Sequence, residues 1–376
     1  MVSSNFYVEG LFLVKISISI NRIWTLVVLT LLLKVVLYVY FSFFLEGVVL
    51  GGGNDADYYH LYALGNYNNT VAVNFWPVIL RFLNENGLYD RQIITIILFI
   101  GSITLLPFMY YNIVKINSDE NKLVKAGSYF LIIFYPTIFY MTADIYRDVF
   151  MFIIFLLSLL IYKKILRSGF FIGIFYFFIY LSLAFFLSLL RPYLGFALAV
   201  TPFIYLIFSK TKKYFKRWII FYFVILILIK VTGGLNEILV YRESFGLSDG
   251  GTTFGISLLG KNLITFLFYY FLSILFQLFG LFFVNITSVA AFFLESLPFT
   301  YAFFFLQKNI KFMNSFVIFL LTFFVIYSTI WLLGNDNLGT AVRLRIPSYL
   351  AIFASMFITY QAKVATIYEK IKEETS

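Results

Sequence analysis

The chain of 376 residues contains no cysteine and a single histidine, and these two shortages exclude several kinds of chemistry. Without cysteine it can form neither disulfide bonds nor thiolate metal sites. With His60 as the only histidine, a metal site built from several imidazoles is excluded as well. Charged residues make up only 12% of the chain, so few segments can carry ionic or acid–base chemistry.

Apolar residues are abundant instead. The chain is 62% hydrophobic, it contains 50 Phe and 29 Tyr, and its mean hydropathy is +0.92. A soluble core cannot use that much apolar surface, whereas a lipid bilayer can. The net charge of +10 is better explained by cytoplasmic loops that face anionic lipids than by a nucleic-acid partner.

We therefore expect an all-α, polytopic transmembrane bundle that forms one integral membrane domain over residues 1–376, because backbone groups in hydrocarbon must be paired within helices. Apolar runs of about 17–25 residues predict the spans. They lie near 24–46, 91–112, 126–142, 149–166, 170–190, 193–209, 218–232, 287–306, 313–333 and 346–362. The segment 262–284 is either an eleventh span or a re-entrant or in-plane segment.

Lysine predicts the orientation, since Lys and Arg accumulate in cytoplasmic loops. With ten spans and both termini cytoplasmic, nearly all lysine-bearing loops fall on one side. These lysines are Lys115, Lys122, Lys125, Lys163, Lys164, Lys210, Lys212, Lys213, Lys216, Lys308, Lys311, Lys363, Lys370 and Lys372.

Arginine follows the opposite pattern. The outer loops of this topology are 47–90, 143–148, 233–261 and 334–345. With the outer span ends at Arg91 and Arg191 they hold seven of the ten arginines. These are Arg81, Arg91, Arg147, Arg191, Arg242, Arg343 and Arg345. A planar guanidinium binds phosphate through two parallel hydrogen bonds, so the outer face is expected to hold an anion. The alternative is internal pairing with the aspartates of the same loops.

An acidic motif follows the first span, where a glycine run precedes Asp55, Asp57 and His60. Either carboxylate could act as a general base toward a sugar hydroxyl or could bind a divalent cation. The alternative is a solvated turn, since Gly, Asn and Asp favour turns. His60 is a candidate substrate contact, with a hydrogen-bonded structural role as its alternative.

Two further candidates flank helix ends. Pro136 followed by Arg147 and Asp148 predicts a kinked helical hairpin with a polar tip, where Arg147 is placed to bind a phosphate. The alternative is an Arg147–Asp148 pair that caps the next helix. Arg191 precedes a proline at a helix start, and an arginine so near hydrocarbon is a functional candidate by default.

The last candidates lie in the long outer segments. Arg242 belongs to 233–261, which is long enough to act as a lid. Arg343 and Arg345 precede Pro347 and would form a second anion-binding site. The alternative is that both side chains snorkel to the membrane interface.

These elements resemble the Wzy-type polymerases of bacterial O-antigen and capsule repeat units. The resemblance rests on the chain size, the arginine-bearing outer loops, the Tyr135-Pro136…Arg147-Asp148 hairpin and the terminal segment from Gly339 to Pro347. It implies glycosyl transfer from a polyprenyl-pyrophosphate-linked oligosaccharide at the outer leaflet of the bacterial inner membrane, with membrane lipid and a chain-length regulator as partners.

Under this hypothesis Asp55, Asp57, Arg147 and Arg191 are catalytic. His60, Asp148, Arg242, Arg343 and Arg345 bind substrate, and no organic cofactor is needed. The acidic loop also resembles the first-loop motif of C-type membrane glycosyltransferases, which use a polyprenyl-phosphate sugar donor. A flippase of lipid-linked glycans and a ligase that joins glycan to a lipid core are the remaining alternatives.

Overall fold

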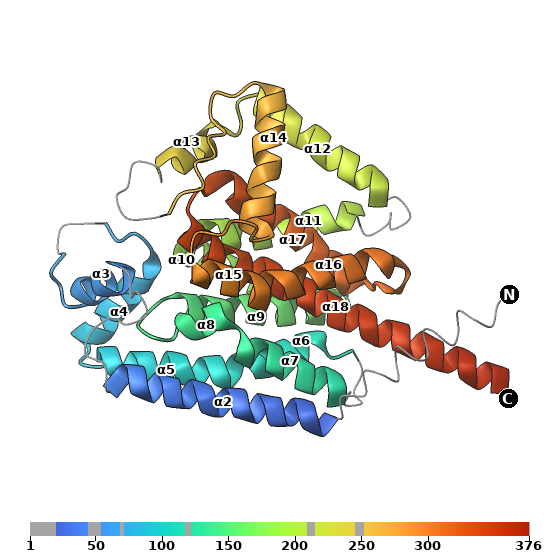
Figure 1. The fold of residues 1–376 in the computed structure, drawn as a ribbon, viewed down its shortest axis with the longest axis horizontal. Coiled ribbons are helices and arrows are strands. Elements are labelled where there is room, and N and C mark those ends of the chain that lie inside the picture. The colour runs from blue at the N-terminus through green and yellow to red at the C-terminus, as the bar shows by residue number, and fades with distance from the viewer. Residues whose placement is uncertain are drawn as a thin grey trace.

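The computed structural model describes residues 20–43, 54–67, 71–116, 122–208, 215–244 and 252–375. Across these residues the regular structure is helical, and the β pairing is confined to an isolated bridge between Thr253 and Asn337. The predicted all-α, polytopic helical bundle is therefore confirmed (Figure 1).

Seventeen α-helices follow one another along the described residues. In order they are α2 Ile20–Phe43, α3 Asn54–Ala63, α4 Phe75–Glu85, α5 Arg91–Ile103, α6 Leu105–Val114, α7 Lys122–Phe134, α8 Pro136–Tyr140, α9 Asp148–Ile165, α10 Phe170–Leu190, α11 Pro192–Phe208, α12 Phe215–Val231, α13 Asn236–Ser244, α14 Leu263–Ser273, α15 Ile286–Ala291, α16 Leu297–Lys308, α17 Ser315–Gly334 and α18 Leu338–Thr375. Short π-helical turns extend α14 and link α15 to α16.

Six helical segments of the described chain are long and apolar enough to cross a membrane, by length and composition alone. They are Arg22–Tyr40, Arg91–Val114, Phe170–Leu190, Ile286–Lys308, Ser315–Gly334 and Leu338–Lys370. The bent pair α12–α13, which turns by 83°, would make a seventh. This is fewer than the ten expected spans.

The difference has physical causes that are visible in the remaining helices. The run 126–142 is divided at Pro136, which begins α8, because proline cannot continue the hydrogen bonding of α7. Helix α9 is 18 residues long but carries Asp148, Lys163 and Lys164. Helix α11 has 17 residues and begins at Pro192, as expected for a proline in a first turn.

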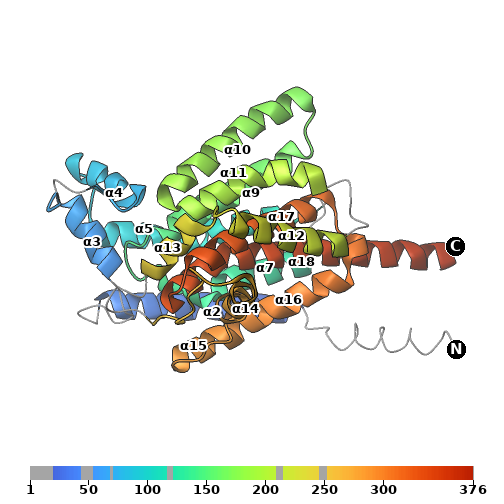
Figure 2. The same cartoon turned by 90° about the horizontal axis from the view of Figure 1, so that it is seen from above.

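The sequence left undecided whether the segment 262–284 is an eleventh span or a re-entrant or in-plane segment. Its helix α14 runs across the direction of the main bundle in both views (Figures 1 and 2), and the chain after the π-helical turn is not helical until Ile286. This is the arrangement expected of the in-plane alternative.

Parts of the expected outer loops are helical. Helices α3 and α4 lie within 47–90, and α13 lies within 233–261. Helix α18 begins at Leu338 because the Asn337 side chain accepts the Thr340 N–H at 3.0 Å, so Arg343 and Arg345 are helical and Pro347 lies inside the helix. The glycine run before Asn54 and residues 245–251 lie outside the described residues.

The helices give the molecule two distinct ends. Helices α3 and α4 cover one end of the bundle, and the C-terminal part of α18 projects from the other (Figures 1 and 2). Buried faces of α9, α17 and α18 form the centre, whereas α2 and α10 expose many large apolar side chains, as lipid-facing helices do. The polar groups described next lie at the end covered by α3.

Candidate functional site

Five parts of the chain bring charged side chains together at this end. They are the first turn of α3, the segment 143–148, the start of α5, the residue that follows α10, and the start of α18. The spacing along the chain is very large, since Arg343 bonds Asp55 across 288 positions. Most of these charges were predicted as candidates in different loops of one outer face, and Arg91 and Asp144 were not among the candidates.

Asp148 is the centre of the cluster, and its side chain is fully buried at the first residue of α9. Its Oδ2 accepts a hydrogen bond from Arg343 Nη2 at 2.6 Å, and its Oδ1 lies 3.4 Å from Arg191 Nη2. Burial alone would raise the pKa of Asp148, but the guanidinium groups of Arg343 and Arg191 hold this pKa well below its usual range. Asp148 is therefore an anion that holds two arginines in place.

Arg147 differs from its neighbours because no described side chain forms a hydrogen bond or ion pair with it. Its Nε is buried without a partner. Burial lowers the pKa of Arg147, and so does the adjacent charge of Arg191. The expected alternative, a cap-like Arg147–Asp148 pair, is not formed, because Asp148 is bonded to Arg343 and paired with Arg191 instead.

The neighbouring arginines also keep unused donors. Arg191 is 5% exposed, and its Nη1 is buried without a hydrogen-bond partner. Arg343 binds two carboxylates, Asp148 and Asp55, while its Nε has no partner. Three guanidinium groups thus meet two carboxylates in this part of the cluster, which we call the basic half (Arg147, Arg191, Arg343, Asp148 and Asp55). A surplus positive charge and unpaired donors mark it as a place for an anion.

An acidic half lies beside it and consists of Asp55, Asp57 and Asp144 with Arg91. Arg91 donates from Nε and Nη2 to both oxygens of Asp144, at 2.9 and 2.5 Å, and from Nη2 to Asp57 at 2.9 Å. The carboxylates of Asp55 and Asp57 remain half exposed. Asp55 belongs to both halves, because Arg343 Nη1 donates to it at 2.8 Å.

Sequence reasoning did not select Arg91, Asp144 or Tyr59 as site residues. Arg91 and Asp144 could be found only as members of the outer charge set, since neither stands in a motif. Tyr59 is buried beside the basic half; burial raises the pKa of Tyr59, and the Arg147 charge opposes that rise. Its hydroxyl accepts a hydrogen bond from Asn74 Nδ2 at 3.3 Å.

His60 lies at the edge of the cluster and not among its charges. Its Nδ1 is 2.8 Å from the Tyr89 hydroxyl. Burial lowers the pKa of His60, and the Arg91 charge lowers it further, so the ring is neutral at pH 7. This contact fits the hydrogen-bonded structural role that was its alternative.

Arg242 lies apart from the cluster and is 1% exposed. Its guanidinium donates to Asp336 Oδ1 at 2.6 Å, to the Leu332 carbonyl at 2.7 Å and to the Ile256 carbonyl at 2.9 Å. Asp336 in turn accepts the Gly255 N–H at 3.1 Å. The pair therefore connects α13, the non-helical segment 253–258 and the α17–α18 junction.

Arg345 forms a second buried tie on the other side of α18. Residues two apart on a helix point in different directions, so Arg345 does not join Arg343. Its Nη2 donates to Glu295 at 3.0 Å, and Glu295 accepts the N–H of Thr137 at 2.9 Å. A Cβ on Gly280, whose φ is +68°, would lie 3.0 Å from Arg345 Nη1, so glycine lets that turn approach the guanidinium.

Comparison of the chain with models of known families, with curated proteins and with solved structures gives no match. The geometry of the site is therefore the basis for its chemistry.

The two halves suit different parts of one reaction. The basic half offers fixed guanidinium groups, which stabilise negative charge on a bound or departing phosphate. The acidic half offers half-exposed carboxylates, which accept a proton from a hydroxyl group. Within the described residues no three His, Asp or Glu side chains come together as a metal site.

Proposed function

We propose that this chain polymerises lipid-linked oligosaccharide repeat units by glycosyl transfer from polyprenyl pyrophosphate, at the outer leaflet of a bacterial inner membrane. The observation that carries the proposal is Arg147, a partly buried arginine beside two others, whose Nε is buried without a hydrogen-bond partner and which pairs with no carboxylate of the described residues. A pyrophosphate is a multiply charged anion, and it would supply the acceptor oxygens that the basic half lacks.

In this mechanism the basic half binds the donor. Arg147, Arg191 and Arg343 contact the pyrophosphate of the lipid carrier. As the bond between the anomeric carbon and the pyrophosphate oxygen breaks, negative charge grows on that oxygen, and the fixed guanidinium groups stabilise it without reorganising. Asp148 keeps Arg191 and Arg343 in position before the substrate arrives.

The acidic half binds the acceptor. The acceptor hydroxyl oxygen forms the new bond to the anomeric carbon, and its proton passes to Asp55 or Asp57. Asp55 is the favoured base, because it is half exposed and its partner Arg343 also contacts the buried centre of the basic half. Asp57 shares Arg91 with Asp144 and would orient the acceptor.

The other expected substrate residues take supporting roles in this proposal. Arg242 and Arg345 hold helices together through buried ion pairs, and His60 orders α3 through Tyr89. A chain-length regulator would be a separate membrane partner of the polymerase.

The test is a surface-glycan gel from cells that carry the chain with single substitutions. Arg147→Ala should reduce polymerisation by about 10²–10³-fold, the effect of losing one transition-state donor, so that single repeat units replace the ladder. Arg147→Lys keeps the charge but not the planar fork, and should restore only part of the ladder.

Arg81→Ala is the matched control. Arg81 is another arginine of the expected outer face, paired with Glu85 on α4 and outside the cluster. It should leave the ladder normal. A normal ladder from membrane-inserted Arg147→Ala would overturn the proposal.

The same gel separates the alternatives after deletion of the chain. A C-type glycosyltransferase, which uses the acidic residues of α3 with a polyprenyl-phosphate sugar, would leave a ladder that lacks one sugar. A flippase or ligase would abolish all surface glycan. Collapse of the ladder to one repeat unit is the outcome that the polymerase requires.

A further inference from the structure

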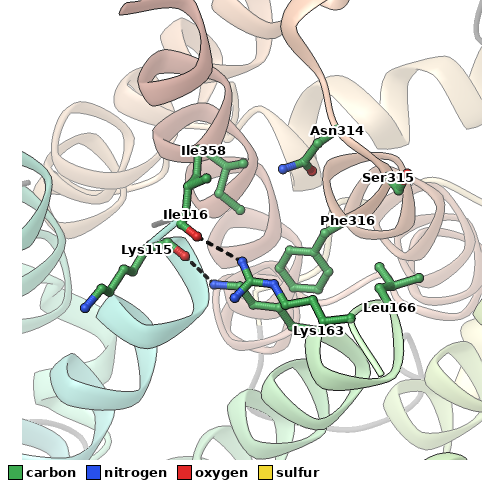
Figure 3. A pocket seen from close by; sticks show the side chains of 9 residues that line it. Lys115, Ile116, Lys163, Leu166, Asn314, Ser315, Phe316 and Ile358 are labelled. Carbon is green, nitrogen blue, oxygen red and sulfur yellow. Dashed lines mark hydrogen bonds between the residues drawn. The ribbon is translucent and has the colours of Figure 1, made fainter. Parts of the chain in front are cut away.

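A cavity of about 200 Å³ lies at the opposite end of the bundle from the charged cluster. It is bounded by the end of α6, the end of α9 and the beginning of α17 (Figure 3). This volume is below the 300–1,000 Å³ of sites for drug-sized ligands, so the cavity fits a small group and not a sugar chain.

The polar lining of the cavity is basic. Lys115, Lys163 and Arg167 line it together with Asn314 and Ser315, and none of the residues that line it is acidic. Three cations so close together repel one another, and that repulsion is relieved most directly by a bound anion.

The three cations are not equally committed to the protein. Lys163 Nζ donates to the carbonyls of Asn112 at 2.8 Å, Ile113 at 2.7 Å and Lys115 at 2.5 Å, so it closes the end of α6 and has no donor left for a ligand. Arg167 donates one hydrogen bond, from Nη2 to the Ile116 carbonyl at 3.0 Å. Its other N–H groups, and the Lys115 ammonium, form no hydrogen bond within the described chain and are free for a ligand.

The depth of the cavity indicates what the ligand is attached to. The candidate span Arg91–Val114 runs from Arg91 in the charged cluster to the residue before Lys115, and 24 residues at 1.5 Å each separate these ends by at most about 36 Å. The hydrocarbon core of a bilayer is about 30 Å thick, so the cavity lies at the level of the phospholipid headgroups of the other leaflet. Basic pockets between membrane helices on that side bind anionic headgroups.

We propose that this cavity binds a phosphate group, supplied by the headgroup of an anionic phospholipid. The free donors of Lys115 and Arg167 bond its oxygens, and Lys163 holds the end of α6 in place beside them. The site is separate from the charged cluster, so its occupancy and glycan transfer can be tested independently.

The experiment measures lipid binding to the full chain in detergent by native mass spectrometry, with dioleoyl phosphatidylglycerol against dioleoyl phosphatidylcholine. The wild-type chain should bind the anionic lipid at least tenfold more tightly. The double variant Lys115→Gln/Arg167→Gln should lose that preference while Lys163 continues to hold α6.

Lys164→Gln is the matched control. Lys164 is on the same helix end, lies over the Tyr176 ring and does not line the cavity, so its removal lowers the positive charge nearby and leaves the cavity lining unchanged. It should bind phosphatidylglycerol as the wild-type chain does. Equal binding of phosphatidylglycerol by the double variant and the control would overturn the proposed lipid site.

A second arm distinguishes the source of the phosphate. Inorganic phosphate is added at constant ionic strength, and thermal unfolding is followed. If phosphate alone stabilises the wild-type chain and not the double variant, while the anionic lipid shows no preference, the cavity is a free-phosphate site. If neither probe depends on Lys115 and Arg167, the cavity binds no phosphate and the proposal fails.

Discussion

Among single residues, Arg147 is the one whose placement in the charged cluster is expected to lower the stability of the fold. The Nε of Arg147 is buried without a hydrogen-bond partner, which costs free energy, and the charges of Arg191 and Arg343 add repulsion. A protein keeps such a group where it is needed for function, and stability and activity are then expected to respond in opposite directions.

The first residue-scale prediction follows from this cost. Arg147→Met removes the charge and keeps an unbranched chain, so the thermal midpoint should stay the same or rise while polymer formation is lost. Arg191→Met is the comparison, because it deprives buried Asp148 of a partner and should lower the midpoint. A clear loss of stability in Arg147→Met would mean that this arginine is structural.

Asp148 should behave in the reverse way. In Asp148→Asn an amide faces three arginines whose mutual repulsion is no longer offset, and the chain should lose about 3–5 kcal/mol of stability. Adding Arg147→Met should recover part of this loss, since one of the three charges is gone.

The control for Asp148→Asn is Asp90→Asn, an exposed N-cap of α5. Asparagine caps a helix about as well as aspartate, so this variant should leave stability nearly unchanged. If Asp148→Asn were equally silent in urea or thermal unfolding, Asp148 would not be the centre of the cluster.

At the scale of elements, the ion pair between Arg242 and Asp336 decides how α13 is held against the α17–α18 junction. Every contact of this guanidinium is inside the protein. The sequence indicated an anion-binding arginine in a long outer loop, whereas the geometry favours a structural role. The two roles give different results on substitution.

Arg242→Ala should lower the free energy of unfolding by about 3–5 kcal/mol, because it leaves Asp336 buried without its partner. The fluorescence of the four tryptophans gives the readout in detergent. The double variant Arg242→Met/Asp336→Asn should be less destabilised, since no unpaired charge remains. If Arg242→Ala unfolds like the wild-type chain yet makes no polymer, Arg242 contacts the substrate.

Helix boundaries show which parts of the fold could be read from the sequence. Pro192 begins a helix as predicted, whereas Pro136, expected as a kink within the run 126–142, divides that run and begins α8. The start of α18 was placed too late, because the cap depends on Asn337 and Pro347 is accommodated within the helix. Local backbone preferences are visible in the sequence, and competition among them is settled by packing.

The charged cluster was predictable in its residue types and not in its pairings. Arginine on the expected outer face identified Arg147, Arg191 and Arg343 as candidates for an anion site. That Asp148 would bind the last two and leave the first unpaired depends on how the start of α9 packs against the end of α10 and against α18, which lies 195 positions away at Arg343. One sequence without pairing information cannot supply such long-range contacts.

At the scale of the whole molecule, the absence of cysteine allows a direct measurement of the orientation. The proposed function needs the charged cluster outside and the phosphate cavity inside. Asn86, exposed at the end of α4, marks the first end. Gly169, between α9 and α10, marks the second, and a side chain there meets no neighbour within 4 Å.

Asn86→Cys should react with a membrane-impermeant maleimide in intact spheroplasts, and Gly169→Cys should react only after permeabilisation. The parent chain, which has no thiol, must remain unlabelled. Labelling of both sites from outside would show that the α9 end near Gly169 is not on the inner side. Reversed labelling would put Arg147 and its neighbours in the cytoplasm, where polymerisation at the outer leaflet could not use them.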